Sequence, residues 1–349
     1  MGQDGDMREQ GKTRPDGGAK RPTIRDVASV AGVSYGTVSR FLNGGKWVSK
    51  SASDAIEAAI EETGYTANQQ ARSLATGRTD SIALVISGPH SNLFTDPTLA
   101  TLVQGASHQA MVRNMTLIIL LAGDDAERSH VESYLKAQHV DGVIMVSQQE
   151  NDVLLEKLLD AGLPVVTLGQ PLGFDERVRY VGIRERESAR TMTRYLQGRG
   201  YTSIALISGP LNSAGGRLRR EGFEAEMGEL LDPTLLLESP YDLEGGHRAM
   251  VELLGREERP QAVFAASDVI ARGALRAINE SGLRIPDDIA LASFDDADPA
   301  TGVRMKLTTM RQPLRTISEA AVNLLVDQID GEDADSRVLD TELVIGEST

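Results

Sequence analysis

Apolar runs alternate with helical stretches along residues 80–349, and this alternation restricts the possible folds more than any other feature. The runs are Ile82–Ile86, Leu117–Leu121, Val143–Val146 and Val165–Leu168, followed after Val178 by Tyr180–Ile183, Ile204–Ile207, Ala262–Ala266 and Ile289–Ser293. Strands that are apolar throughout and separated by helices form parallel sheets covered on both faces. Two such series predict two α/β lobes with a cleft between them. Ligands of open α/β sheets bind beyond the carboxyl ends of the strands.

The N-terminal part of the chain follows a different pattern, with short helices and no apolar strand. Thr23 and Asp26 are spaced as a capping box at the start of a first helix. Gly32 supplies a turn, and Ser34 caps a second helix. A third helix is expected from about Ser51 to Thr63. These features predict a helix-turn-helix unit.

The second helix of this unit has two different faces. Val38, Phe41 and Leu42 recur at core spacing, whereas a different face is formed by Tyr35, Gly36, Ser39 and Arg40. An outer face with hydroxyls and a guanidinium suits the major groove of DNA. Two short helices around a glycine also occur in many other folds, so the helices that follow are needed to support this interpretation.

A short segment with a helical pattern follows the third helix. Asn68 is placed to cap it and Gly77 to end it. Helices below about 12 residues are marginal alone in water. A linker that becomes helical only against a partner indicates folding coupled to binding.

These segments resemble the lactose-repressor/galactose-repressor (LacI/GalR) family of transcriptional regulators. The resemblance extends from residue 22 to the C-terminus, and its most specific parts are Thr37–Arg40 and Ala71–Leu74. In that family the hinge helices of two subunits pair in the minor groove, and a leucine from each opens a central base step. The matching residue is Leu74. Inserting such a side chain costs a few kcal/mol because two base pairs are unstacked, and the kinked duplex then contacts more of the protein surface.

The resemblance implies an α/β fold with a helix-turn-helix headpiece and a two-lobed body like that of type I periplasmic sugar-binding proteins. The expected division is a disordered tail at 1–20, a headpiece at 21–66, a hinge helix and linker at 67–79, and an effector-binding and dimerisation domain at 80–349 that crosses between lobes near 178, 296 and 330. The expected DNA contacts are Thr23, Ser34, Tyr35, Thr37, Ser39, Arg40, Asn43, Asn68, Arg72 and Leu74. The expected partner is a pseudo-palindromic double-stranded operator.

Local motif matches place the effector contacts in the cleft. Gly216–Phe223 resembles the family segment whose arginine, four residues before the aromatic, holds effector hydroxyls, and this residue is Arg219. Ala266–Gly273 resembles the strand-end segment whose aspartate accepts bonds from sugar hydroxyls, and this residue is Asp268. The remaining expected contacts are Phe94, Tyr241 and Asp295. An arginine opposite a buried carboxylate suits a polyol because both groups make directed bonds.

Each of these effector residues also has a simpler alternative role. Asp268 could only cap the helix that follows it, and Arg219 could coat a helix surface with its neighbouring arginines. The two aromatic candidates could be packing residues, as single aromatics commonly are. Asp295 could cap a turn.

The chain departs from the family pattern at several positions. Gly36 has no side chain to read a base, and Trp47 is unusual in the loop after the second helix. Ala67 replaces a proline that commonly precedes the hinge asparagine. Arg184–Glu185 stands where an acidic pair is usual, which puts one familiar ligand contact in doubt. The loop Ser91–Pro97 is longer than typical, so effector identity is not transferred from any relative.

Composition excludes several other classes of protein. The chain has no cysteine, which excludes disulfides and thiol catalysis. No apolar run has the length of a membrane span, and the polar N-terminus does not resemble a signal peptide, so a cytoplasmic protein is expected. Phosphate-binding loops and metal-ligand spacings of histidine are missing from the sequence, so no cofactor, metal or enzymatic activity is expected. A transport receptor, the nearest rival, would need a secretory signal.

The charge of the chain is unevenly distributed. The net charge is −15, but residues 21–79 hold seven Lys/Arg against five Asp/Glu, and residues 80–349 hold 25 against 42. An acidic body repels DNA everywhere except at its weakly basic head, although soluble bodies are often acidic for other reasons. The weak basicity indicates that affinity depends on the two heads of a dimer together.

The sequence therefore predicts a homodimeric transcriptional regulator, a repressor of carbohydrate uptake or catabolism genes. The expected effector is a sugar or sugar phosphate, with a nucleobase or another non-sugar metabolite as the alternative. Ligand binding in the cleft is expected to change lobe closure and the pairing of the hinge segments, and so to shift the population that binds the operator.

Overall fold

The structure is a computed structural model that describes residues 22–42, 48–66, 77–88, 96–146, 149–174, 176–297 and 305–349. It divides into two compact units, Met1–Gly77 and Arg78–Thr349, and each is described by itself. The tail 1–20 and residues 67–76 of the expected hinge lie outside the described residues, as do the expected contacts Asn43, Asn68, Arg72, Leu74 and Phe94.

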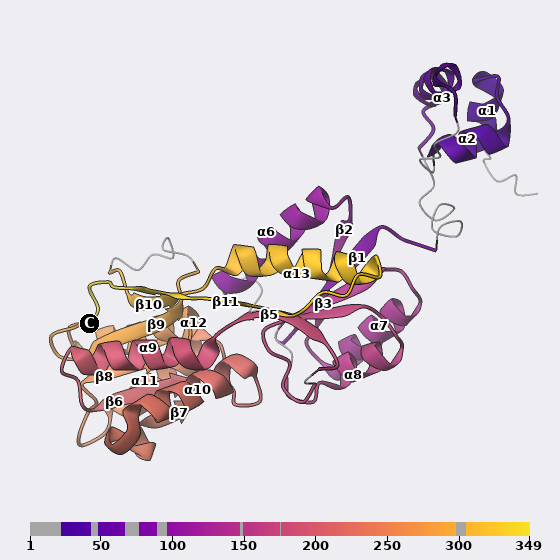
Figure 1. The fold of residues 1–349 in the computed structure, drawn as a ribbon. Coiled ribbons are helices and arrows are strands. Elements are labelled where there is room, and N and C mark those ends of the chain that lie inside the picture. The colour runs from indigo at the N-terminus through magenta and orange to yellow at the C-terminus, as the bar shows by residue number, and fades with distance from the viewer. Residues whose placement is uncertain are drawn as a thin grey trace, which may run out of the picture. The chain divides into compact units, whose positions relative to one another are not determined.

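Three helices form the described part of the N-terminal unit. They are α1 (Ile24–Val30), α2 (Tyr35–Leu42) and α3 (Lys50–Thr63) (Figure 1). Gly32 lies in the turn between the first two with φ +67°, and Gly64 ends α3 with φ +62°. Val27, Val38 and Ile56 are fully buried between the helices. The predicted helix-turn-helix unit with its third helix is confirmed.

The unit Arg78–Thr349 consists of two lobes, each built on a six-stranded sheet (Figure 1). The sheet of the first lobe is parallel throughout, in the order β11-β5-β4-β3-β1-β2. Its strands are β1 (Ser81–Ser87), β2 (Thr116–Ala122), β3 (Gly142–Val146), β4 (Val165–Leu168), β5 (Arg179–Ile183) and β11 (Arg337–Leu339). Its helices are α6 (Pro97–Val112), α7 (Asp125–Lys136), α8 (Val153–Asp160) and α13 (Leu314–Ile329).

The second lobe has the strand order β12-β10-β9-β8-β6-β7. Its strands are β6 (Ile204–Ser208), β7 (Leu236–Glu238), β8 (Ala262–Ala265), β9 (Ala290–Asp295), β10 (Thr308–Arg311) and β12 (Glu342–Val344). Its helices are α9 (Glu185–Gly198), α10 (Ala214–Met227), α11 (Leu243–Leu254) and α12 (Asp268–Glu280), with short 3₁₀ turns at Gly228–Leu230 and Pro233–Leu235. The edge strand β12 is antiparallel to β10, and the other pairs are parallel.

Both sheets are covered on two faces, as the apolar runs predicted. Along β1, Ile82, Leu84 and Ile86 belong to a core with α6 and α13, whereas Ala83 and Val85 belong to a core with α7 and α8. The second sheet is likewise covered by α9 and α10 on one face and by α11 and α12 on the other. No helix in the described parts of the chain has both the length and the apolar character needed to span a membrane.

The chain passes between the lobes three times, each time later than predicted. Strand β5 completes the first sheet, so the first passage follows residue 183 rather than 178. Strand β10 still belongs to the second sheet, which moves the second passage from 296 to residues 311–314. Strand β11 returns to the first sheet, which moves the third from 330 to residues 339–342. The predicted positions of the three passages were wrong because the chain adds one more short strand to a sheet, β5, β10 or β11, before each passage to the other lobe.

Candidate functional site

The described DNA-binding candidates lie around the start and outer face of α2. The Ser34 hydroxyl accepts a hydrogen bond from the backbone N–H of Thr37 at 3.1 Å and is 2.8 Å from the Thr37 hydroxyl, so both help to begin the helix. Tyr35 is 55% exposed, Ser39 is half-buried and Arg40 is exposed. This surface therefore offers a phenol and a guanidinium to a partner.

Two of these side chains already make local contacts. Thr23 at the start of α1 donates from its backbone N–H and its hydroxyl to Asp26 Oδ2, each at 2.7 Å. Arg40 Nε donates to the carbonyl of Gly36 at 3.1 Å, one turn earlier on α2. This bond holds the guanidinium of Arg40 along the helix, next to Gly36, which has no side chain.

A cavity of about 330 Å³ lies between the two lobes of the Arg78–Thr349 unit. It is lined at the carboxyl ends of β1, β3, β4 and β5 in the first lobe, and beyond β6, β8 and β9 in the second. This is the place that the strand pattern predicted for a ligand. The polar and charged residues that line it are Ser87, Asp96, Thr98, Gln149, Glu185, Asn212, Ser213, Arg219, Tyr241, Asp242, Ser267, Asp295 and Gln312.

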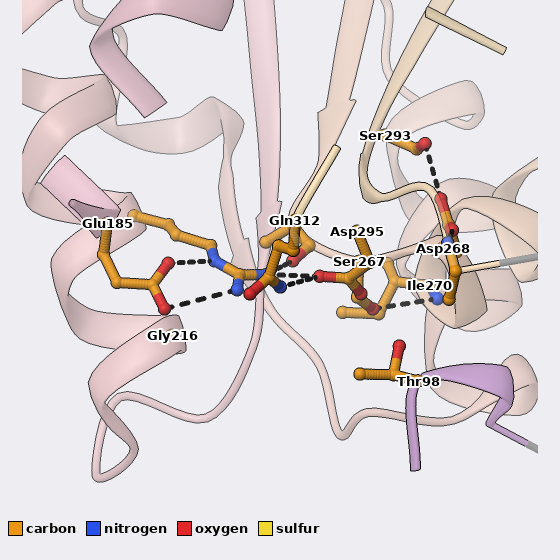
Figure 2. A network of polar contacts seen from close by, with 12 residues as sticks. Thr98, Glu185, Gly216, Ser267, Asp268, Ile270, Ser293, Asp295 and Gln312 are labelled. Carbon is orange, nitrogen blue, oxygen red and sulfur yellow. Dashed lines mark hydrogen bonds and ion pairs between the residues drawn. The ribbon is translucent and has the colours of Figure 1, made fainter. Parts of the chain in front are cut away.

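Arg219 is the central charged group of this cavity. Its Nε and Nη2 donate to the two carboxylate oxygens of Glu185 at 2.7 and 3.4 Å, and its Nη1 donates to the carbonyl of Ala266 at 2.5 Å and to Asp295 Oδ1 at 3.3 Å (Figure 2). The guanidinium also lies 3.7 Å from the centre of the Phe294 ring. Burial lowers the pKa of Arg219, but Glu185 and Asp295 raise it more, so the group stays charged.

Asp295 ends β9 in a backbone conformation that few residues adopt. Its φ is +104°, in the region that favours glycine, which indicates local strain at the site. Its carboxylate accepts from Gln312 Nε2 at 2.6 Å, and its carbonyl accepts from the backbone N–H of Gln312 at 3.0 Å (Figure 2). Burial raises the pKa of Asp295 to about 8 despite the nearby Arg219.

Tyr241 lines the cavity and packs closely against a loop. A Cβ atom on Gly209 would lie 2.1 Å from the Tyr241 ring, so that position has to be glycine for the ring to stay where it is. Burial raises the pKa of Tyr241 to about 12, and the phenol therefore stays protonated and can donate a hydrogen bond.

Asp268 is close to this group but does not line the cavity in the structure. Its Oδ1 accepts from the Ser293 hydroxyl at 2.7 Å (Figure 2). Its Oδ2 accepts from the backbone N–H of Ala297 at 3.0 Å. The cap of α12 is Ser267, whose hydroxyl accepts from Ile270 N, so the alternative role of Asp268 as the cap is wrong. Burial raises the pKa of Asp268 to about 6.

The three neighbouring arginines of α10 have three different roles. Arg217 forms a two-bond ion pair with Glu150, a first-lobe residue, with Nη1 2.8 Å from Oε1. The backbone N–H of Glu150 also donates to the carbonyl of Asn212 at 2.7 Å, so the lobes touch directly beside the cavity. Arg220 pairs with Glu224 on the helix surface. Only Arg219 among the three enters the buried cluster.

Sequence reasoning missed several residues of the cavity. Glu185 was noted only as a departure from an acidic pair, yet it is the main partner of Arg219. Gln312, which holds Asp295, and Asp96, which caps α6 by accepting from Thr98 N at 2.9 Å, were not predicted. Their positions in the sequence could have indicated them, because Glu185, Gln312 and Asp96 each lie at the start of a helix or at a passage between the lobes. No cluster of metal-ligating side chains occurs among the residues that the structure describes.

The raised pKa values of the buried aspartates predict a pH dependence of stability. A carboxyl whose pKa lies above its ordinary value of 3.8 binds its proton more tightly in the folded state. Its contribution is therefore fully present at low pH and is lost as pH rises through about 8 for Asp295. Relative to Asp295→Asn, the wild-type unit should lose stability between pH 5 and pH 9, as measured by urea unfolding. Parallel pH profiles of the two proteins would contradict this assignment.

The comparisons with known proteins agree with both units. The profile of bacterial regulatory proteins of the lacI family matches residues 23–68, and that of the periplasmic binding protein-like domain matches residues 193–349. The HTH-type transcriptional regulator CelR of Thermobifida fusca is 38% identical over 335 residues, covering 94% of this chain and 98% of the relative.

Solved structures of relatives give the same result. A transcriptional regulator CelR–cellobiose complex is 36% identical, with a TM-score of 0.75 over 94% of this chain and all of that one. A lac repressor dimer bound to operator and an anti-inducer is 26% identical, with a TM-score of 0.83 over 94% of this chain and 99% of that one. The fold and its cleft thus define a bacterial DNA-binding transcriptional regulator with a periplasmic-binding-protein-like body. The chain belongs to the lacI family.

Proposed function

We propose that this regulator represses genes of carbohydrate uptake or catabolism and is controlled by a sugar bound in the interlobe cavity. The observation that carries the proposal is the buried group of Arg219, Glu185 and Asp295 at the centre of the cavity. The similar CelR structure is a complex with cellobiose, which supports a sugar as the class of ligand.

The chemistry of the cavity supports a polyhydroxylated ligand. Carboxylates accept and guanidinium N–H groups donate in fixed directions, which matches ligand hydroxyls that do both. The apolar side chains Ile86, Leu102 and Val146 line the first-lobe wall and suit the C–H face of a sugar ring. Tyr241 contributes a phenol donor at the second-lobe side. In this proposal Asp268 does not contact the ligand. It positions Asp295 through its hydrogen bonds to Ser293 and to the backbone of Ala297.

We further propose that a homodimer in the cytoplasm places two headpieces on a pseudo-palindromic operator. Tyr35, Ser39 and Arg40 would face the major groove, with Thr23, Ser34 and Thr37 at the helix starts. The further proposed DNA contacts are Asn43, Asn68, Arg72 and Leu74. Sugar binding would change the lobe arrangement and thereby the fraction of dimers that can pair their hinges on DNA.

The function is tested by measuring operator affinity as ligand is added. An operator selected from random duplexes is labelled, and its complex with the full chain is titrated with cellobiose while fluorescence anisotropy is recorded. A fall in operator affinity is expected at sugar concentrations that also raise the melting temperature of the protein. A melting shift without any change in operator affinity would contradict a regulatory role for the cavity.

Arg40 is expected to contribute sequence preference rather than general affinity. Losing a guanidinium contact to a guanine edge costs roughly 1–3 kcal/mol of discrimination. Arg40→Ala should therefore weaken binding to the operator while leaving binding to random duplex DNA nearly unchanged. The matched control is Arg25→Ala, which removes an exposed arginine of α1. A parallel loss on both DNAs would make Arg40 a phosphate contact.

A further inference from the structure

We infer that Glu185 makes the interlobe cavity selective for an uncharged ligand, because it occupies the edge of Arg219 with which an anionic group would pair. The inference rests on the proposed function of the cavity as the effector site. Sugar phosphates and sugar acids are then excluded from the class of effectors, and Glu185 is the residue that excludes them.

The hydrogen-bonding capacity of Arg219 is almost fully used within the protein. An arginine has five N–H donors, and phosphate or carboxylate binds best to two parallel ones. Glu185 takes Nε and one N–H of Nη2, while Ala266 O and Asp295 take the two N–H groups of Nη1. Among the contacts of the described residues, one N–H of Nη2 remains, which suffices for a hydroxyl but not for a two-bond contact with an anion.

Four of the helix N-termini at the cavity, which are other usual anion sites, are also occupied, whereas α9 and α13 begin there without a side-chain cap. Helix N-termini attract anions through their free N–H groups and the helix dipole. At α6 the carboxylate of Asp96 accepts from Thr98 N, and at α11 the carboxylate of Asp242 accepts from Gly245 N. Ser213 and Ser267 cap α10 and α12 in the same way. The protein has thus filled these positions with its own acceptors.

The charges of the side chains that line the cavity also favour an uncharged ligand. Among the described lining residues, the acidic side chains are Asp96, Glu185, Asp242 and Asp295, and the single guanidinium is that of Arg219. Burial raises the pKa of Asp295 to about 8, so the negative charge near neutral pH comes from the other three. A phosphate would meet like charge in a partly desolvated space, where repulsion is strong. A neutral ligand avoids this repulsion. The lining residues Ser87 and Thr98 have buried hydroxyls without a hydrogen-bond partner in the described part of the chain.

The first experiment compares cellobiose with cellobiose 6′-phosphate by calorimetry on the full chain. The wild type should bind only the neutral sugar. Glu185→Gln removes the charge at nearly constant shape, and the ratio of the two dissociation constants should then shift toward the phosphate by at least about ten-fold. Glu221→Gln, which removes a carboxylate that pairs with Arg186 outside the cavity, should leave the ratio unchanged. Equal binding of both sugars by the wild type would overturn the inference.

The second experiment uses inorganic phosphate, so it does not depend on which sugar is the effector. Phosphate should raise the melting temperature of Glu185→Ala, but not of the wild type or of the double variant with Arg219→Ala. If Glu185→Ala does not fold, Glu185→Gln takes its place in this comparison. Failure of phosphate to bind any Glu185 variant would refute the role of Glu185. Failure of cellobiose alone would count against the proposed function and leave this result standing.

Discussion

Arg219→Ala is expected to abolish the response to effector and to lower the free energy of unfolding of the Arg78–Thr349 unit by about 3–5 kcal/mol. The substitution leaves Glu185 without its counter-charge and Asp295 without its bond to the guanidinium in a buried space, because their side chains are only 11% and 7% exposed. It also removes the donor to the Ala266 carbonyl. Urea unfolding and calorimetric titration with cellobiose measure the two effects.

The control for this prediction is a neighbouring arginine on the same helix. Arg220 pairs with Glu224 four residues away, and both side chains are about one-third exposed. Arg220→Ala should therefore cost less than about 1 kcal/mol, as exposed ion pairs do, and should retain effector binding. Similar losses in both variants would show that α10 is sensitive to any change and that the buried charge group is not special.

Ile56→Ala is expected to abolish operator binding while leaving effector binding intact. Ile56 is fully buried in the small core of the N-terminal unit. Truncating such a side chain costs about 2–5 kcal/mol, which is comparable to the whole stability of a unit of this size. Operator binding should fall by more than about ten-fold, because the face of α2 is no longer held in place. Fluorescence anisotropy and calorimetry measure the two activities on the same preparation.

The control is Val30→Ala on α1, whose side chain is 46% exposed. It should change operator affinity little, since exposed positions contribute weakly to stability. Loss of cellobiose binding in Ile56→Ala would contradict the separation of the two compact units, which predicts that a core defect in one does not reach the other.

Much of the fold could be predicted because its signals are local. Continuous apolar runs such as Ile82–Ile86 indicate buried parallel strands, and Gly32 and Gly64 mark helix boundaries through their φ angles. The second and third passages between the lobes were misplaced because β10 and β11 are only four and three residues long. Strands of this length are too short to show a periodic pattern in the sequence.

The candidate site was predictable only in part because its contacts join distant residues. Arg219 and Glu185 are 34 positions apart, and Asp295 is 76 positions from Arg219, so no spacing rule relates them. Ser267 and Asp268 show a second limit. Consecutive residues at a helix start point in directions about 100° apart, and the sequence alone does not say which of the two is the cap.

The division of each lobe between distant parts of the chain has a consequence for biosynthesis. Helix α13 packs on one face of the first sheet and β11 extends its edge, yet both follow almost the whole second lobe in sequence. A nascent chain can fold its three N-terminal helices early, since domains fold as units during translation. Until residues 314–339 leave the ribosome, α6 alone covers that face of the first sheet, and the part that α13 packs against stays exposed. Chaperones are expected to shield that face during the interval.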